Sequence, residues 1–371
     1  MDKNIKEKHK VKPIKLSSNR VWRTYLGGKL LDEWQGLDQA SDQHFPEEWI
    51  MSITSARNTG REHLVNEGLG MVSNESDLSL KELITSSPQD MLGKKHVEKV
   101  GPHTGVLVKI IDSSERLAVQ VHPDRKMAKE LFQSDYGKTE CWHILGGREI
   151  DGEPPYVYLG FKPGITKEKW REIFEEQNID EMLACMHKIY VKPGETYLLE
   201  GGIPHAIGSG CFLVEIQEPT DLTIRTERTS PSGFQIADNM CHQGIGFDKM
   251  FECFRYEGYT REETLKKWKV KPELIEKDPF HSETEVIGYN TTPYFRMTMV
   301  EVRTEVELKT EGIFTGLYVL SGKATIDTDQ GKESLEKADQ FFIPANIGTY
   351  KLTQNGDEPL KVLRLFGPKI S

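Results

Sequence analysis

Four residues have side chains that ligate metals and a spacing that can bring them together: Gln120, His122, Glu140 and His205. Gln120 and His122 stand two apart in the alternating stretch LAVQVH, so a strand there points both side chains to one face. The four offer a neutral oxygen, two imidazoles and one carboxylate, which suits a borderline divalent ion such as Zn²⁺ with room left for a substrate. We therefore predict one metal site.

The segments around these residues are expected to place them on strands and turns. Pro123 ends the first strand, residues 125–133 have a helical pattern, and Gly137 precedes a second strand that carries Glu140. His205 follows a turn in GGIPHAIGSG, among residues too small to crowd it. Each candidate taken singly is more often an ordinary surface or hydrogen-bonded residue. Three strand-borne candidates and a fourth in a glycine-bounded turn favour the metal site.

The charge balance limits the partners. Lys and Arg number 48 against 58 Asp and Glu, which gives a net charge of -10. This balance argues against a general affinity for nucleic acid or an anionic membrane surface. A phosphorylated substrate would have to be held by a few local cations. No apolar run approaches the roughly 20 residues that a spanning helix needs.

The cysteines and the N-terminal segment bear on the compartment. The five cysteines are odd in number and form no CxxC pair, so we expect reduced, structural thiols and a cytoplasmic protein. Residues 1–15 are rich in Lys but lack the apolar stretch of a secretory signal. We expect residues 1–19 to be a solvated tail.

The pattern along the chain predicts a mainly β protein with helical insertions. Short strands with turn signals are typical of a jelly roll or barrel. Helical spacing marks residues 77–99 and residues 166–188, and EETLKKWKV predicts a short helix. The clearest predicted strands are 156–161, 188–191, 196–199 and 211–217.

An internal repeat predicts two copies of one barrel. Residues 317–326, LYVLSGKATI, resemble CWHILGGREI, and residues 338–350 resemble GETYLLEGGIPHA. With offsets of 175 positions for the first pair and 144 for the second, Glu140 falls on Thr315 and His205 on Thr349, so the second copy lacks the metal ligands. We expect a metal-binding cupin-like domain, a mixed connecting segment and a second cupin-like jelly roll without ligands, over residues 20–225, 226–285 and 286–371.

Four ordered motifs resemble the type I mannose-6-phosphate isomerases, zinc enzymes of the cupin superfamily. The motifs are QVHP at 120–123, GKTECW at 137–142, PGETYLLEGGIPHAIGSG at 193–210 and EIQEPTDLTIR at 215–225. The resemblance implies paired cupin cores, one zinc ion per chain and interconversion of mannose 6-phosphate and fructose 6-phosphate. It also implies that Gln120, His122, Glu140 and His205 are zinc ligands and that Arg225 is an active-site arginine.

The implied reaction moves a proton between C1 and C2 through an enediol, so it needs a base, a polarised oxygen and a group that holds phosphate. Arg225 offers a forked cation for phosphate or a developing oxyanion. Lys138, two residues before Glu140, is the second expected cation because it leaves the same strand face. Glu215, Asp221 and Lys138 are open alternatives for the base.

Each of these has a structural alternative. Lys138 can be a solvated turn residue, Arg225 can pair on the surface with Glu227, and Glu215 can pair with a structural Arg. The sequence also departs from the family pattern. Arg125 and Lys126 stand where many relatives have a second acid, Gly137 stands where longer members have a His, and TERTSPSG replaces the usual aromatic-acidic run after Arg225.

Two other functions stay open. His122, Glu140 and His205 also match a two-His-one-carboxylate triad for Fe²⁺ and O₂, although Gln120 would fill a position that oxygen chemistry needs open. The third hypothesis is a non-catalytic cupin that binds a phosphosugar as a regulator. The sequence gives neither the preferred sugar nor the oligomeric state.

Overall fold

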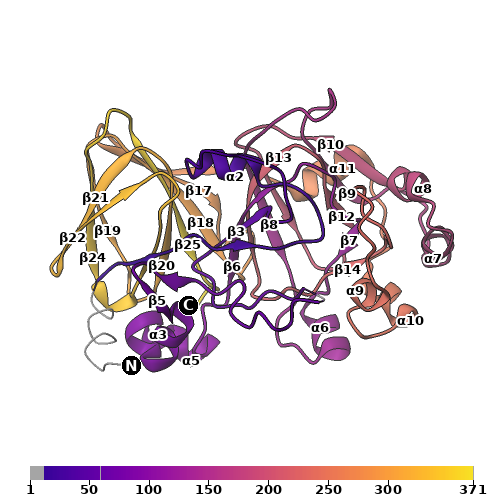
Figure 1. The fold of residues 1–371 in the computed structure, drawn as a ribbon, viewed down its shortest axis with the longest axis horizontal. Helices are drawn as coiled ribbons and strands as arrows, with labels where there is room; N and C mark the ends of the chain where they lie inside the picture. Colours follow the sequence, from indigo (N-terminus) through magenta and orange to yellow (C-terminus); the bar gives the residue numbers. More distant parts are fainter. Residues whose placement is uncertain (1–11, 59, 371) are drawn as a thin grey trace.

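The computed structural model describes residues 12–58 and 60–370. Strands make up 36% of the protein and helices 20%, so the prediction of a mainly β fold is confirmed. The described strands form four open sheets, and no closed barrel of the expected kind is found among them. The sheets instead stack in two pairs, which form an N-terminal and a C-terminal lobe (Figure 1).

The N-terminal lobe pairs a seven-stranded sheet with a five-stranded sheet. In spatial order the larger sheet contains β15 (Lys269–Val270), β11 (Thr196–Leu199), β8 (Glu140–Gly147), β13 (Cys211–Gln217), β6 (Leu107–Asp112), β3 (Glu47–Ile50) and β2 (Arg20–Val21). The smaller contains β10 (Met186–Tyr190), β9 (Tyr156–Phe161), β12 (His205–Ile207), β7 (Gln120–Val121) and β14 (Ile224–Arg225). Apolar side chains of both sheets, including Trp142, Leu159 and Leu213, form the core between them.

The C-terminal lobe repeats the design with a nine-stranded and a four-stranded sheet. The larger contains β16 (Glu273–Lys277), β17 (His281–Ile287), β18 (Arg296–Val302), β25 (Leu360–Phe366), β20 (Thr315–Ser321), β23 (Gln340–Ile343), β1 (Ile14–Leu16), β4 (Met71–Val72) and β5 (Glu75–Ser79). The smaller contains β19 (Glu305–Lys309), β24 (Thr349–Gln354), β21 (Lys323–Thr328) and β22 (Gly331–Glu336).

Strand order shows that the lobes are copies of one another. The larger sheets share the run β11-β8-β13-β6 in one lobe and β23-β20-β25-β18 in the other. The smaller sheets share β10-β9-β12-β7 and β22-β21-β24-β19. Glu140 and Thr315 each begin the equivalent strand, as do His205 and Thr349, so the internal repeat is confirmed.

Helices account for the length difference between the lobes. Residues 162–185, between β9 and β10, contain α7 (Lys167–Glu176) and α8 (Ile179–Ala184), whereas the equivalent strands β21 and β22 are joined by a two-residue turn. With α9 (Asp238–His242), α10 (Phe247–Met250) and η1 (Phe251–Cys253), these helices cover the outer face of the five-stranded sheet, at the right of Figure 1.

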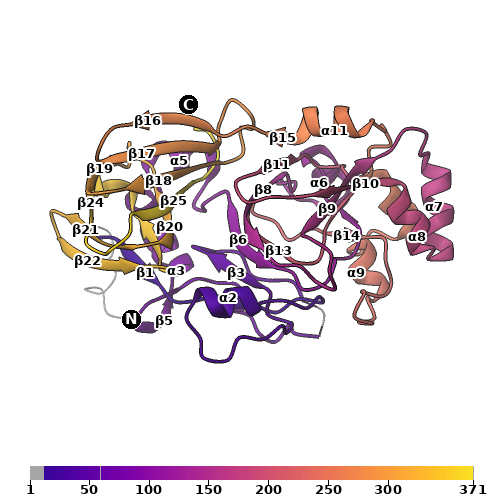
Figure 2. The ribbon, with the colours of Figure 1, turned by 90° about the horizontal axis from the view of Figure 1, so that it is seen from above.

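The other helices are short and lie elsewhere. They are α2 (Lys29–Trp34), α3 (Leu80–Ser86), α4 (Pro88–Leu92), α5 (Lys94–Val100), α6 (Arg125–Phe132), α11 (Arg261–Trp268) and η2 (Ala345–Ile347). Ser79 caps α3 with a capping box to Glu82, and Pro88 begins α4, which is why the helical pattern at 77–99 divides there. In Figure 2, α11 lies along the upper edge of the N-terminal lobe and α7 lies at its right-hand end.

The N-terminal segment departs from the expected 1–19 tail. Residues 1–11 lie outside the described residues, but Ile14–Leu16 form β1 and pair with β23 of the C-terminal lobe. Buried Ile14 and Leu16 explain the pairing, because the strand contributes to the core between the lobes. The mixed segment 226–285 holds α9 to α11, β15, β16 and the start of β17.

Candidate metal centre

The structure brings the four predicted ligand residues together. Gln120 lies on β7 and His122 directly follows it, while Glu140 and His205 begin β8 and β12. Because β7 lies between β12 and β14, Gln120 pairs with both His205 and Arg225. All four side chains are buried, and they face the interior between the two sheets.

Short distances join the donor atoms. His122 Nε2 lies 3.1 Å from Glu140 Oε2, and His205 Nε2 lies 3.3 Å from Glu140 Oε1. The two Nε2 atoms are 3.2 Å apart, and His205 Nε2 is 3.3 Å from the amide nitrogen of Gln120. A 180° rotation of the Gln120 side-chain amide would exchange its nitrogen and oxygen, so that the oxygen faces the two histidines. The donor atoms of both histidines and Glu140 lie within 4.8 Å of one another.

Backbone carbonyls orient the two imidazoles. His122 Nδ1 lies 2.9 Å from the carbonyl oxygen of Leu222, and His205 Nδ1 lies 2.8 Å from that of Ile203. Each Nδ1 therefore carries the proton and donates it, which leaves the Nε2 lone pairs directed at the centre. Burial, with the charge of Lys138, lowers the pKa of His122 to about 3, and burial also lowers the pKa of His205. Both rings are neutral, as metal ligands must be.

Close backbone approaches hold the three strands in place. A Cβ atom on Gly137 would meet the Arg125 nitrogen at 2.8 Å, and one on Gly201 would meet Asp124 Cα at 2.5 Å. Gly202 donates its amide to the carbonyl of His122 at 2.7 Å. Glycine is needed at both close contacts because a side chain would push the Glu140 strand and the His205 loop away from the turn after His122.

The donor set fits a zinc ion. Glu140 Oε1 is buried and accepts no hydrogen bond from any residue that the structure describes. An unpaired buried carboxylate oxygen is costly, and a cation between the two histidines would satisfy it. Nitrogen and oxygen donors of this kind suit Zn²⁺.

Lys138 reaches the same centre. Its Nζ lies 2.6 Å from Glu140 Oε2, 2.8 Å from His122 Nε2 and 4.0 Å from Glu215 Oε1. The lysine is 3% exposed, so it is not the solvated turn residue that the sequence left open. Burial opposes ionisation of Glu140, but the charge of Lys138 keeps the pKa of Glu140 well below its usual range.

Arg225 lines the cavity next to the metal centre without a carboxylate partner among the described residues. Its guanidinium donates to the carbonyls of Thr223 and Met240, at 3.3 and 3.1 Å, and burial lowers its pKa. The surface pair with Glu227 is not formed, because Glu227 binds Arg116 at 2.9 Å. A cation bound only by carbonyls is well placed to receive an anion.

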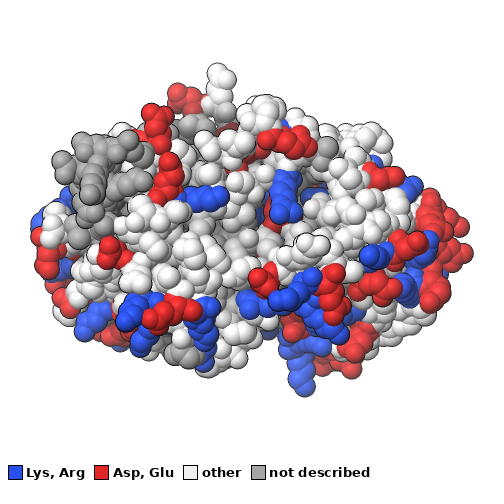
Figure 3. All heavy atoms as spheres, turned by 90° about the horizontal axis from the view of Figure 1, so that it is seen from below, with Lys and Arg blue, Asp and Glu red and all other residues white. Residues whose placement is uncertain are grey.

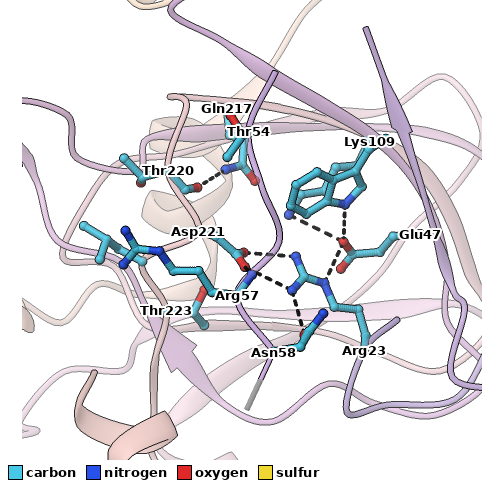
Figure 4. Close-up of polar contacts among 12 residues, drawn as sticks. Arg23, Glu47, Thr54, Arg57, Asn58, Lys109, Gln217, Thr220, Asp221 and Thr223 are labelled. Carbon is cyan, nitrogen blue, oxygen red and sulfur yellow. Dashed lines mark hydrogen bonds and ion pairs between the residues drawn. The ribbon is translucent and has the colours of Figure 1, made fainter. Parts of the chain in front are cut away.

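The two carboxylates considered as bases differ in their surroundings. Glu215 Oε1 lies 3.0 Å from Lys109 Nζ, and its Oε2 accepts from Trp142 at 3.0 Å. Asp221 forms two hydrogen bonds of 3.0 Å with Arg23 (Figure 4). Burial alone would raise the pKa of Asp221, but the charges of Arg23 and Lys109 hold it far below the usual range.

Sequence reasoning missed the charged network that supports these groups. Arg23 and Lys109 both lie close to Glu47, Arg23 with an N–O distance of 2.9 Å and Lys109 at 3.8 Å (Figure 4). Burial would raise the pKa of Glu47, yet the two cations lower it to about 2. Lys109 could have been found from the sequence, because it is the one charged residue in the apolar strand VLVKII.

Family models match two parts of the chain. Residues 39–139 match the catalytic domain of the type I phosphomannose isomerases, and residues 285–357 match the mannose-6-phosphate isomerase cupin domain. Over these two parts the chain is similar to the type I phosphomannose isomerase family. The first match contains Gln120, His122 and Lys138, and the second lies in the C-terminal lobe, which lacks the metal donors.

Curated relatives of this family extend the match. The chain is 27% identical over 267 residues to the probable mannose-6-phosphate isomerase GmuF of Bacillus subtilis, covering 71% of this chain and 78% of the relative. It is 27% identical over 260 residues to mannose-6-phosphate isomerase ManA of the same organism, covering 68% and 73%.

Solved structures of phosphomannose isomerases share the fold. A mannose 6-phosphate isomerase of Bacillus subtilis covers 95% of this chain and 99% of its own, with a TM-score of 0.71 and 20% identity. A putative mannosephosphate isomerase of Archaeoglobus fulgidus covers 96% and 97%, with a TM-score of 0.70 and 21% identity. A zinc-bound mannose 6-phosphate isomerase has a TM-score of 0.71 at 14% identity, over 96% of this chain and 99% of its own. In the part of the chain that the structure describes, no helix is long and apolar enough to cross a membrane.

Proposed function

We propose that the protein is a zinc-dependent isomerase that interconverts mannose 6-phosphate and fructose 6-phosphate. The observation that carries the proposal is the buried cluster of His122, Glu140 and His205, in which Glu140 Oε1 has no hydrogen-bond partner among the described residues. The named relatives, all mannose-6-phosphate isomerases, support the substrate and the reaction.

Gln120, His122, Glu140 and His205 would hold one zinc ion per chain. Zinc bound there supplies a Lewis acid that polarises the sugar oxygens at C1 and C2 without redox chemistry. The carbonyl groups that fix both histidines support this role, since metal-bound imidazoles are oriented by such second hydrogen bonds.

Lys138 and Arg225 would bind the reacting end of the sugar. Both line the cavity beside Gln120, and both are positively charged groups in a water-poor site, where they stabilise negative charge on an enediolate oxygen. Lys138 is held by Glu140 at 2.6 Å, and Arg225 retains donors beyond its two carbonyl partners.

Glu215 and Lys138 are the better supported choices for proton transfer between C1 and C2. Glu215 lines the same cavity, and its Oε1 has an ion pair with Lys109 at 3.0 Å but no arginine bound to it. Asp221 is a weaker base because both oxygens are bound by Arg23 and its pKa is strongly lowered. Its role would be to position the loop that contains Leu222.

We further propose that the two lobes, residues 20–225 and 286–371, are cupin-like jelly-roll cores joined by the mixed segment 226–285. The shared strand order supports this division, although β1 extends the second core. The five cysteines are all unpaired and buried, which supports a reducing compartment such as the cytoplasm.

Metal analysis of the purified protein, combined with a coupled assay on mannose 6-phosphate, tests the function. We expect close to one zinc per chain, and we expect His205→Ala to lose the zinc and at least about 10³-fold in kcat. His281→Ala, a matched change in the C-terminal lobe, should retain both. Iron with oxygen uptake, or zinc with phosphosugar binding and no turnover, would refute the proposal in favour of an oxygenase or a regulator.

A further inference from the structure

An outer cleft adjoins the metal centre. Two cavities of about 660 and 680 Å³ meet at Ser55, Ala56 and Arg57 and at Gln243 and Gly244. We call the first of them the outer cleft; its walls are residues 54–57, 131–134, Tyr136, 219–222 and 243–245. A cavity of this size accommodates a sugar phosphate.

The outer cleft is contiguous with the inner cavity beside the metal ligands. Asp221 lines both, and Asn58 of the inner cavity is next in sequence to Arg57. Leu222, another cleft residue, accepts the hydrogen bond from His122 Nδ1. Asp221 therefore lies at the boundary between the inner cavity, of about 40 Å³, and the outer cleft.

Arg57 gives the outer cleft a free positive charge. Its side chain is exposed, and its guanidinium has no ion pair or hydrogen bond with the residues that the structure describes. The carboxylate in this cleft, Asp221, is already neutralised by Arg23. In the neighbouring cavity Arg61 is paired with Glu67 at 2.7 Å. The outer cleft is therefore locally cationic in a protein with a net charge of -10.

The backbone around Arg57 is fixed while its side chain is not. The Arg57 amide donates to Asp221 Oδ2 at 3.2 Å, and Asn58 Nδ2 donates to the carbonyl of Trp22 at 2.9 Å. Figure 4 shows the Arg57 side chain extending away from the Arg23–Asp221 pair. The face seen from below carries Lys and Arg side chains beside a central hollow (Figure 3). The loop thus anchors the guanidinium at the rim without using its donors.

We propose that Arg57 binds the phosphate group of the substrate in the outer cleft, helped by the hydroxyl of Thr54. The inference rests on the proposed function, and it separates two tasks: Lys138 and Arg225 act at the C1–C2 end, and Arg57 recognises the far end. A six-carbon chain puts these ends apart, so the half-buried Arg225 and the exposed Arg57 suit different parts of one substrate. A planar, always-charged guanidinium with five donors matches a phosphate dianion.

Arg57→Ala tests the assignment in the zinc-loaded, full-length protein. We expect kcat/KM for mannose 6-phosphate to fall about 10- to 100-fold, mainly through KM, because a charge-assisted bond made equally in ground and transition states is lost. Inorganic phosphate should inhibit the wild-type protein competitively and inhibit the variant far less. Arg57→Lys should retain an intermediate phosphate affinity, and Lys129→Ala, which removes the same charge from the nearby helix α6, should match wild type.

Unchanged KM and phosphate inhibition in Arg57→Ala would overturn the proposal, as would a loss of kcat alone. Loss of phosphate inhibition in Arg225→Lys but not in Arg57→Ala would move the phosphate to Arg225 and overturn it too. Calorimetry with the unreactive hexitol mannitol 6-phosphate separates the two proposals. If mannitol 6-phosphate binds only when Arg57 is present but mannose 6-phosphate is not turned over, the isomerase proposal is refuted and the phosphate-site proposal stands. If turnover is the same with and without the Arg57 side chain, only the phosphate-site proposal is refuted.

Discussion

Single residues at the centre divide into the proposed metal donors and the groups proposed to act on the substrate. His122 and His205 are fixed through Nδ1 and are neutral, so their geometry serves a cation. Glu215 and Asp221, by contrast, are both acids on the inner cavity, yet only Asp221 has both oxygens bound by an arginine. The surroundings of a carboxylate, rather than its residue type, decide whether it can take a proton.

Glu215→Gln should lower kcat on mannose 6-phosphate by about 10²- to 10⁴-fold, because the amide cannot accept a proton in general base catalysis. The zinc content should stay at the wild-type level, since Glu215 is not among the donors. Steady-state kinetics and metal analysis check both expectations. Glu195→Gln, which removes a carboxylate bound to Lys269 near the surface, serves as the control. A Glu215→Gln enzyme with near wild-type kcat would leave Lys138 as the base.

At the scale of elements, loops far apart in sequence are tied together at the site. Arg23 follows β2, Asp221 precedes β14, and the two are 198 positions apart. Asp221 also accepts from the Arg57 amide, so one carboxylate anchors the segment after β3 to the loop that orients His122. Removing the Asp221 carboxylate would take one charged partner from the buried guanidinium of Arg23.

Asp221→Asn should destabilise the protein by roughly 1.5–3 kcal/mol at neutral pH, because Arg23 loses one of its two carboxylate partners and keeps only Glu47. The pKa of Asp221 is lowered in the folded state, so its contribution is fully present above the unfolded value near 3.8 and is lost as the pH falls below it. Denaturant unfolding between pH 7 and pH 2.5 should show the variant and wild type converging in acid. A difference that stays constant with pH would contradict the assigned charge pairing.

At the scale of the whole molecule, the two lobes share one core. A hydrophobic cluster joins Ile110 and Val214 of the N-terminal lobe to Phe342 and Leu365 of the C-terminal lobe. The side-chain oxygen of Gln340, on β23, accepts a hydrogen bond from the backbone N–H of Met51 at 2.9 Å. Its side-chain nitrogen donates one to the Glu48 carboxylate at 3.0 Å. The lobe without metal donors therefore supports the strand that precedes the Arg57 loop.

We expect the protein to unfold in a single calorimetric transition rather than one for each lobe, because the shared core couples them. Gln340→Ala should lower the free energy of unfolding by about 1–3 kcal/mol, the cost of leaving the Met51 amide and Glu48 unsatisfied. Gln330→Ala, at the exposed β21–β22 turn, should change it little. Two resolved transitions in the wild-type protein would show that the lobes are independent.

Much of the fold followed from local pattern. The strands at 156–161, 196–199 and 211–217 were predicted with the bounds that the structure has, because short strand runs between turn signals depend only on neighbouring residues. The internal repeat predicted the duplicated strand order in the same way. Two jelly-roll barrels are not confirmed, and residues 14–16 of the expected tail form β1, since sheet closure and the pairing of β1 depend on distant strands.

The sequence by itself predicted the residues that meet at the buried centre, because their types are those of zinc ligands and Gln120 and His122 stand two apart. Only the tertiary structure decided which charges are free to act. It bound Asp221 to Arg23, left Arg225 on carbonyl partners and placed an unpaired Arg57 beside the cleft. The residue type gives the charge of a side chain. Its burial and its partners depend on contacts between segments that are far apart in the sequence.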